Sequence, residues 1–466
     1  MKREGPLFPS SRDSIRLQQK CDGSWCDNPI IYPLRVDPCA RRFFRPSLFR
    51  RFYAAHLSLS LSDISRSPSL SRSPTAPSNS FLSSNEMRLG SAIMASRVPF
   101  LVFVAGLLSL SYWLLGQPLL ASHPELRRIS NLDLVLGQEL PSHLNFSSRA
   151  RDYYASPQAR AFCDAHGYTV FAPRSRSGER KIYDLFMVNT ELDWMEIRLE
   201  TLYDHVDYFV IVESPKTFQG NDKPLTVLAS WERFRRFHDK MVYHQLSFPA
   251  SFDPKRPWDY EDLQRDAMYD QVFPQLAGRA APVYGDVILV ADVDEIPRPE
   301  SLFLLRTCNF PRRLTLASRF YYYSFQFLHS GPEWPHPQAT YYTGWRTVRP
   351  TNLRNGDGGV PFLRDLDKSR LSNAAWHCSS CFATMEQFLN KMASFSHVWM
   401  NDDEYRNKDN IAKAVRDGKD VWGRDIDTFE RIERNQDIPP VLRREGDKYK
   451  YLLDRSGKSA GFTDYP

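Results

Sequence analysis

The sequence predicts an α/β fold: one folded domain on a mostly parallel sheet, preceded by a transmembrane helix. Strand and helix patterns alternate from Lys181 onward, and an uncharged apolar stretch lies upstream of them. Such alternation implies right-handed crossovers and parallel neighbours in one sheet. The apolar run 287–291 ends in the carboxylates Asp292, Asp294 and Glu295, so a ligand is expected there, at the carboxyl end of a strand.

The expected elements follow in chain order. Strand patterns occupy 182–188, 208–212, 241–246 and 287–291, and helical patterns occupy 192–206, 225–237, 259–276, 385–394 and 408–417. A capping-box-like pair, Asp193 and Glu196, marks the start of the first helix. The aromatic-rich segment 314–327 indicates antiparallel strands after the parallel part.

Charge is distributed unevenly along the 466 residues. Residues 1–97 hold 15 of the 61 Lys and Arg residues but only 7 of the 55 Asp and Glu residues. Because this segment is basic and rich in Ser and Pro, we predict a disordered cytoplasmic tail, with Met87 and Met94 as alternative starts. The remainder carries about −2 of the total of +6, and this balance excludes nucleic acid as an expected partner.

Residues 98–115 carry no charge, and we predict a signal-anchor helix at 98–117. Arg88 and Arg97 precede it, so the positive-inside rule places the N-terminus in the cytosol and the rest of the chain in the lumen. A cleaved signal peptide is the alternative, because Leu-Leu-Ala-Ser at 119–122 is a weak cleavage pattern.

We predict a lumenal stem at 118–178 and the folded domain at 179–466. Asn145-Phe146-Ser147 is an N-glycosylation sequon, which a lumenal stem would expose.

Four cysteines would lie on the lumenal side: Cys163, Cys308, Cys378 and Cys381. They permit three pairings, among which the sequence does not choose. For Cys378 and Cys381 we expect a disulfide rather than half a zinc site or a redox pair, because no second Cys/His pair at zinc spacing is evident and the lumen is oxidising. His377 is either a packed core histidine or a ligand for a metal or phosphate.

The strand-end carboxylates are the expected metal site. Asp292 and Asp294 are two residues apart, so an extended backbone would point both in the same direction, and Glu295 in the other. Carboxylates suit a hard ion such as Mg²⁺ or Mn²⁺, which can bridge nucleotide phosphates. The competing interpretation is an acidic turn after a strand.

Several ordered motifs resemble glycosyltransferase family 17 over about residues 181–422. They lie at 186–193, 198–199, 210–214, 220–225, 292–297 and 376–382. The resemblance implies a GT-A-like fold and a type II Golgi membrane enzyme that uses UDP-GlcNAc and a divalent metal, with Mn²⁺ as the expected ion. It further implies transfer of N-acetylglucosamine, with inversion, to a β-linked mannose of a protein N-glycan.

The resemblance also implies residue roles. Asp292 and Asp294 would hold the metal, with His377 as a further ligand for the metal or a phosphate. Arg265 would contact the diphosphate, although a solvated helix face is the alternative. The residues that follow the first two strands would bind the nucleotide sugar; they are Asn189, Glu191, Glu213 and Ser214.

The sequence leaves the general base and the acceptor open. Inversion requires a base for the acceptor hydroxyl, and the candidates are Asp365, Asp367 and Glu404. Ser380 stands where the family pattern leads us to expect an aromatic residue, so another UDP-sugar or another mannose-containing acceptor is an alternative. A metal-dependent phosphohydrolase and a non-catalytic glycan-binding protein are the alternatives from other functional classes.

Overall fold

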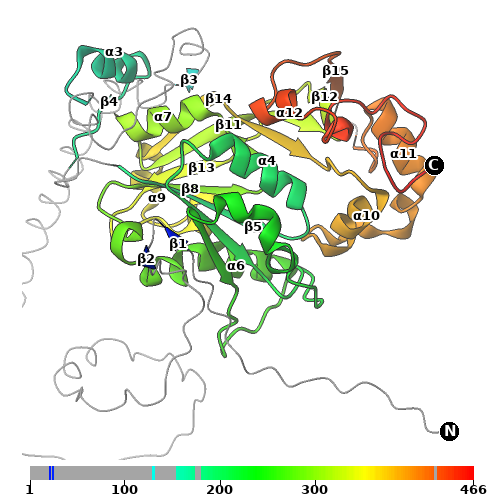
Figure 1. The fold of residues 1–466 in the computed structure, drawn as a ribbon, viewed down its shortest axis with the longest axis horizontal. Helices are drawn as coiled ribbons and strands as arrows, with labels where there is room; N and C mark the ends of the chain where they lie inside the picture. Colours follow the sequence, from blue (N-terminus) through cyan, green and yellow to red (C-terminus); the bar gives the residue numbers. More distant parts are fainter. Residues whose placement is uncertain (1–19, 22–23, 26–128, 132–153, 174–179, 425–427) are drawn as a thin grey trace, which may run out of the picture. The chain divides into compact units, whose positions relative to one another are not determined.

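The computed structural model describes residues 20–21, 24–25, 129–131, 154–173, 180–424 and 428–466 (Figure 1). Strands β1 (Lys20–Cys21) and β2 (Ser24–Trp25) form an antiparallel pair within residues 1–112, and the other described elements belong to residues 113–466. Among these described ranges, no helix is long and apolar enough to span a bilayer. The predicted anchor 98–117 and the sequon at Asn145 lie outside them.

The domain is built on a mixed sheet with eleven strands in the part of the chain described. Four adjacent strands run parallel, in the spatial order β7 (Met241–Gln245), β6 (Tyr208–Glu213), β5 (Ile182–Val188) and β8 (Val287–Asp292). All four strands were predicted, and β5 has the predicted bounds. Helical crossovers between them explain why they are parallel.

The other half of the sheet is largely antiparallel. Beyond β8 come β13 (Gln338–Tyr341), β11 (Arg313–Tyr322), β12 (Ser324–His329) and β15 (Phe429–Arg431). The prediction of a mostly parallel sheet is therefore correct for the half that contains β5 to β8, and wrong for the half beyond β8. A single residue, Tyr323, separates β11 from β12, and so short a connection permits only an antiparallel pair.

One long strand, β14 (Lys368–Ser379), runs parallel to β11. It also pairs with β9 (Glu295–Pro297), which directly follows the acidic turn, and with β3 (Ile129–Asn131). Through β9, the turn that follows β8 is bound to the strand that carries His377.

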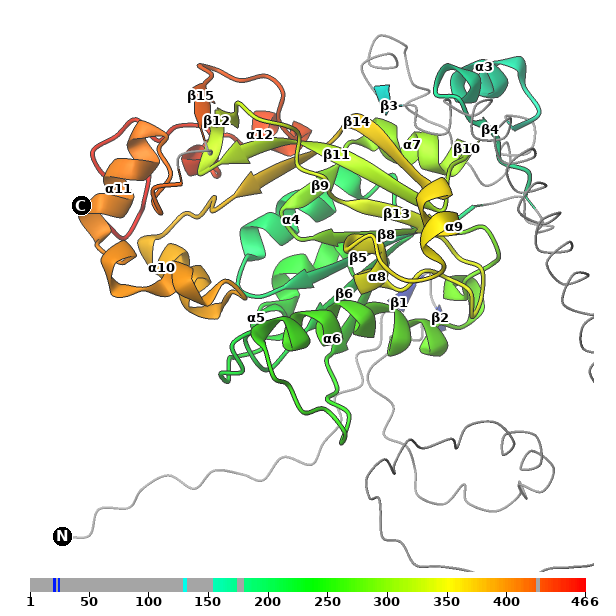
Figure 2. The ribbon, with the colours of Figure 1, turned by 180° about the vertical axis from the view of Figure 1, so that it is seen from behind.

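Helices α4 (Leu192–Leu202) and α6 (Pro257–Asp270) cover opposite faces of the parallel strands (Figures 1 and 2). Alternate residues of β5 explain this: Phe186 packs on the α4 side and Leu185 on the α6 side. The remaining helices are α3 (Pro157–Ala165), α5 (Thr226–Ala229), α7 (Pro299–Thr307), α8 (Pro350–Arg354), α9 (Pro361–Leu366), α10 (Met385–Ser394), α11 (Lys408–Asp417) and α12 (Pro440–Arg444).

Three helix predictions need correction, whereas α10 and α11 have the predicted bounds. The helix expected at 225–237 is split into α5 and a 3-10 helix, Trp231–Phe237. The one expected at 259–276 ends at Asp270, and Pro274 lies in the short 3-10 turn beyond it. Asp193 and Glu196 form no capping box, because both bind Arg233 on a neighbouring segment.

Two disulfides are formed. Cys378 pairs with Cys381, as expected, and Cys163 pairs with Cys308 across 145 residues. Cys163 lies in α3, within the stretch predicted as a stem, and Cys308 begins β10 (Cys308–Asn309), which pairs with β4 (Thr169–Val170). Residues 157–170 are therefore bound covalently and by hydrogen bonds to the domain that follows.

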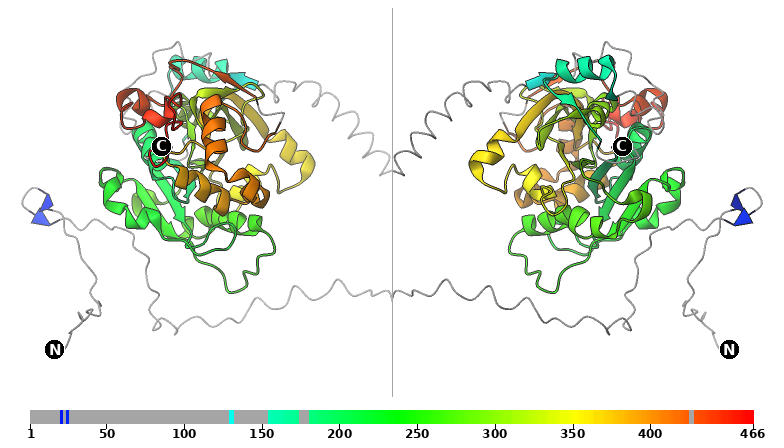
Figure 3. Two further views of the ribbon diagram at one scale, coloured as in Figure 1. Left: turned by 90° about the vertical axis from the view of Figure 1, so that its right-hand side faces the viewer. Right: turned by 90° about the vertical axis from the view of Figure 1, so that its left-hand side faces the viewer.

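Helices α10 and α11 lie side by side where β14 ends, as the side views show (Figure 3). Phe388 and Met392 of α10 share a buried cluster with Ile411 and Val415 of α11. The fully buried Arg455 binds the backbone of the same region, because its guanidinium donates to the carbonyl oxygens of Tyr323, Phe382 and Ala460. Phe382 leads into α10, so the C-terminal segment helps to position that helix.

Candidate functional site

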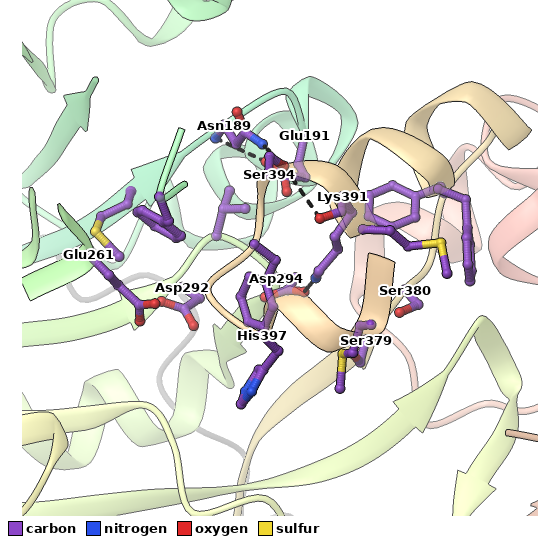
Figure 4. Close-up of a pocket in the computed structure, with 18 of the residues that line it drawn as sticks. Asn189, Glu191, Glu261, Asp292, Asp294, Ser379, Ser380, Lys391, Ser394 and His397 are labelled. Atoms are coloured by element: carbon purple, nitrogen blue, oxygen red, sulfur yellow. Dashed lines mark hydrogen bonds and ion pairs between the residues drawn. The ribbon is translucent and has the colours of Figure 1, made fainter. Parts of the chain in front are cut away.

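A pocket opens at the carboxyl ends of β5, β8 and β14 and is bordered by α10 (Figure 4). Polar and aromatic side chains both line it, and the residues at the ends of β5 and β8 contribute part of the polar lining. The polar lining includes Asn189, Glu191, Glu261, Asp292, Asp294, His377, Lys391 and Ser394, and the aromatic lining includes Phe320, Tyr322, Phe382, Phe388, Trp422 and Phe429.

Asp292 lies on the pocket floor between two arginines. Arg265 Nη1 donates to Asp292 Oδ1 at 3.0 Å, and Arg354 Nη2 donates to Oδ2 at 2.7 Å. Burial alone would raise the pKa of Asp292, but Arg354 and Arg265 outweigh it and hold the pKa below its usual value. The side chain is still 35% exposed, so Asp292 is an ionised carboxylate that is largely neutralised by its neighbours.

Arg265 also extends this network away from the turn. Its Nη2 donates to Glu261 Oε1 at 2.6 Å, and Ser396 donates to the other oxygen of Glu261 at 2.6 Å. Ser396 lies two residues beyond α10, so the segment that borders the pocket is hydrogen-bonded to the charged network under it.

Asp294 faces a different part of the pocket from Asp292. The strand ends at Asp292 and the chain turns before β9, so the extended backbone predicted through both aspartates is not formed. Figure 4 shows Asp292 beside Glu261 and Asp294 below Lys391. Asp294 Oδ1 lies 3.7 Å from His377 Nδ1, and Oδ2 lies 4.0 Å from Lys391 Nζ.

The Asp294 carboxylate has unused hydrogen-bonding capacity. In the described ranges no donor lies within hydrogen-bond distance of it, and burial raises its pKa, an effect that His377 and Lys391 only partly offset. His377 Nδ1 is also buried and has no hydrogen-bond partner there. Its ring stacks on Phe320 and Trp334, which hold it in place. Asp294 and His377 therefore offer an oxygen and a nitrogen ligand that nothing in the described chain satisfies.

The turn itself is fixed from below by Arg198 of α4, which is fully buried. Its Nη1 donates to the carbonyl oxygens of Asp292 at 3.1 Å and Glu295 at 2.7 Å, with a third contact to Val293 at 3.4 Å. Asp184 of β5 supplies the counter-charge through two hydrogen bonds, at 2.7 and 2.6 Å. One guanidinium thus links the strand, the helix and the acidic turn.

Glu295 stabilises the same turn from within. It is fully buried, and its carboxylate accepts from the Asp292 N–H at 2.9 Å, from Trp334 Nε1 at 2.7 Å and from Arg354. Burial would raise the pKa of Glu295, but Arg354 outweighs it and holds the pKa well below the usual value. Glu295 is therefore a structural carboxylate turned away from the pocket.

The residues predicted to bind the nucleotide sugar fall into two groups. Asn189 and Glu191 line the pocket, and Glu191 Oε2 accepts from the backbone N–H groups of Asn189 and Thr190 at 3.0 and 2.9 Å. The structure does not bring Glu213 and Ser214 to the pocket. Glu213 is buried under α5, where it accepts from two backbone N–H groups and from Tyr243, and Ser214 accepts from the Lys216 N–H.

The candidates for the general base lie outside the pocket. Asp365 is exposed at the end of α9, pairs with Lys368 at 3.0 Å and precedes the start of β14, whereas His377 lies near the other end of that strand. Asp367 caps α9 at the same end, and Glu404 lies exposed in a 3-10 turn. The pocket carboxylates are instead Glu191, Glu261, Asp292 and Asp294.

Comparison of the whole chain with known proteins identifies its family. A profile of glycosyltransferase family 17 matches residues 145–458. The chain belongs to glycosyltransferase family 17. This confirms the resemblance carried by the ordered motifs, and the match extends beyond residues 181–422 on both sides.

The relatives that match over part of their length include enzymes from human and mouse. Human (Homo sapiens) β-1,4-mannosyl-glycoprotein 4-β-N-acetylglucosaminyltransferase is 24% identical over 310 residues, which cover 60% of this chain and 56% of the human protein. The mouse (Mus musculus) protein of the same name is 25% identical over 304 residues, with 60% and 55% covered. This family 17 chain therefore spans about half the length of the relatives it matches.

Replacement of Arg198 tests how the turn is held. Arg198→Met should lower the free energy of unfolding by about 3–5 kcal/mol, because Asp184 then stays buried without a counter-charge. The double variant with Asp184→Leu should recover part of that loss. Urea unfolding followed by circular dichroism measures both.

The matched control is Arg431→Met, whose side chain is 38% exposed, and its effect should stay within about 0.5 kcal/mol. If Arg198→Met is as stable as this control, the buried pair does not hold the turn.

Proposed function

We propose that this protein transfers N-acetylglucosamine from UDP-GlcNAc to a β-linked mannose of a protein N-glycan. The observation that carries the proposal is the pocket at the carboxyl ends of β5 and β8, which contains Asp292 and Asp294 of the motif by which the chain resembles family 17. The activity for which the human and mouse relatives are named supports the choice of sugar and acceptor. Membership of a transferase family favours this function over a phosphohydrolase.

The two kinds of lining fit the two substrates. Parallel strands present Asn189, Glu191 and the acidic turn at their carboxyl ends, which is where nucleotides bind in α/β sheets. Rings such as Phe388 and Trp422 also line the pocket and provide flat apolar surfaces for a neutral glycan. The acceptor hydroxyl would then meet the anomeric carbon of the donor between the polar and the aromatic lining, above Asp294. The parallel half of the sheet supports the GT-A-like fold.

We also propose a bound divalent metal, with Mn²⁺ as the expected ion, and inversion of configuration. Asp294 and His377 fit this role, because neither the carboxylate nor the buried Nδ1 is satisfied by the described chain. Asp292 fits less well, since each of its oxygens accepts from an arginine, and in the described ranges no three His, Cys, Asp or Glu side chains form a cluster. When bound, the metal would supply positive charge for the diphosphate.

We propose that the chain is a type II Golgi membrane protein with a lumenal catalytic domain. The uncharged segment 98–115 and the basic residues before it support this topology. The disulfides Cys163–Cys308 and Cys378–Cys381 suit an oxidising compartment.

A direct assay of the purified full-length chain tests the donor and the acceptor. With Mn²⁺ and an N-glycan that contains the core β-mannose, transfer from UDP-GlcNAc should be at least about tenfold faster than from UDP-glucose or UDP-galactose. Mass spectrometry of the glycan gives the added sugar. Equal transfer to a glycan trimmed to its two N-acetylglucosamine residues would rule out mannose as the acceptor, and the absence of any transfer would count against the function as a whole.

A carboxylate variant tests the metal assignment. Asp294→Asn should weaken Mn²⁺ binding by at least roughly tenfold, because a neutral amide is a poor ligand for a hard cation. The readout is the Mn²⁺ concentration needed to raise the melting temperature in the presence of UDP. Asp253→Asn, at a side chain 77% exposed, is the matched control and should behave as the parent. The same metal dependence in both variants would remove Asp294 from the site.

The topology is tested by glycosylation at Asn145. The chain expressed in cultured cells should lose mass on treatment with peptide-N-glycosidase, and Ser147→Ala should abolish that shift because it destroys the sequon. A chain whose mass is unchanged by the glycosidase would speak against a lumenal stem.

A further inference from the structure

Lys391 is a cation at the centre of the pocket that the predicted site did not include. It lies in α10, which begins at a capping box formed by Thr384 and Gln387. Phe388 and Met392, three residues before it and one after it, are buried and fix the helix. The Lys391 side chain therefore projects from a well-packed helix into the pocket, toward Asp294 (Figure 4).

The ammonium group of Lys391 has donors to spare. Its only close charged neighbour in the described ranges is Asp294, at 4.0 Å, which is beyond hydrogen-bond distance. The other Lys and Arg side chains that line the pocket have closer partners. Lys216 binds Asp222 at 2.7 Å, and Arg424 binds Asp420 at 2.6 Å. Lys223 donates to the Asn189 carbonyl oxygen at 3.2 Å. The side chain of Lys391 is 25% exposed, so a ligand can reach it.

The ammonium group of Lys391 lies near two aromatic rings. Nζ lies 5.6 Å from the centre of the Phe382 ring and 5.5 Å from that of Phe395. These contacts restrict where the ammonium can move without using its three N–H donors. A simple counter-ion for Asp294 would be expected to close to about 3 Å, whereas this geometry leaves space between the two groups.

The charges of the two substrates indicate which of them Lys391 binds. Mannose and N-acetylglucosamine are neutral, whereas the diphosphate of the donor is an anion. A compact ammonium at a phosphate is a common arrangement in proteins. We propose that Lys391 binds the diphosphate of the nucleotide sugar, an inference that rests on the proposed function.

Calorimetric titration of the purified full-length chain with UDP, UMP and uridine tests this inference. Lys391→Met should weaken UDP binding by roughly ten- to a hundredfold, the loss of one charged hydrogen bond, and should leave uridine binding unchanged. Lys391→Arg should keep most of the UDP affinity because it keeps the charge. The matched control, Lys413→Met on α11, removes a lysine that is 66% exposed and should bind UDP as the parent does.

The outcomes separate the two proposals. If the parent binds UDP and Lys391→Met binds it equally well, the role of Lys391 is refuted and the proposed function stands. Equal weakening for UDP and uridine would make Lys391 a packing residue and would also refute the inference. A parent chain that does not bind UDP would overturn the proposed function and this inference with it.

Discussion

The buried ion pair between Arg198 and Asp184 determines where the rest of the site lies. Removing two charges from water is costly, and here that cost is offset by hydrogen bonds from all three guanidinium nitrogens of Arg198. Two donors bind Asp184 of β5, and the remaining contacts go to the carbonyl oxygens of the turn that follows β8. The turn is thereby fixed relative to its neighbouring strand, which leads directly to Asn189. In the described ranges Arg198 makes the only hydrogen bonds between α4 and the turn, beside apolar packing that includes Val293.

Above the turn, acidic and basic side chains alternate along a row of neighbours in space. Glu261, Arg265, Asp292, Arg354 and Glu295 form a continuous chain of ion pairs, in which each carboxylate is matched by at least one guanidinium. Asp294 departs from this pattern, since His377 Nδ1 and Lys391 Nζ stand 3.7 and 4.0 Å from its carboxylate. In a partly buried pocket, a bound cation or polar ligand gains the most binding free energy at such an unpaired group. The proposed metal and diphosphate contacts are therefore expected around Asp294 more than at Asp292.

The sequence predicts the parallel half of the fold well, because hydrophobic period and turn residues locate each strand. It fails where a side chain has two possible partners. Glu213 ends a strand, as a ligand-binding residue would, but it caps α5 instead. Arg354 comes from a segment 62 residues beyond Asp292, and no local pattern indicates that contact. Lys391 could have been found from the sequence. Phe388, Met392 and Phe395 recur at helical spacing, and Lys391 lies among them, so its charge falls on the apolar face of the predicted helix.

A crystal structure of the chain with UDP would show whether the turn held by Arg198 forms the floor of a nucleotide-sugar site. We expect the diphosphate in the pocket between Asp294 and Lys391, with the uridine toward Asn189 and Glu191, and with the Arg198 contacts to the turn unchanged. A diphosphate bound away from the turn would contradict this expectation, as would a turn that has moved off Arg198 in the complex.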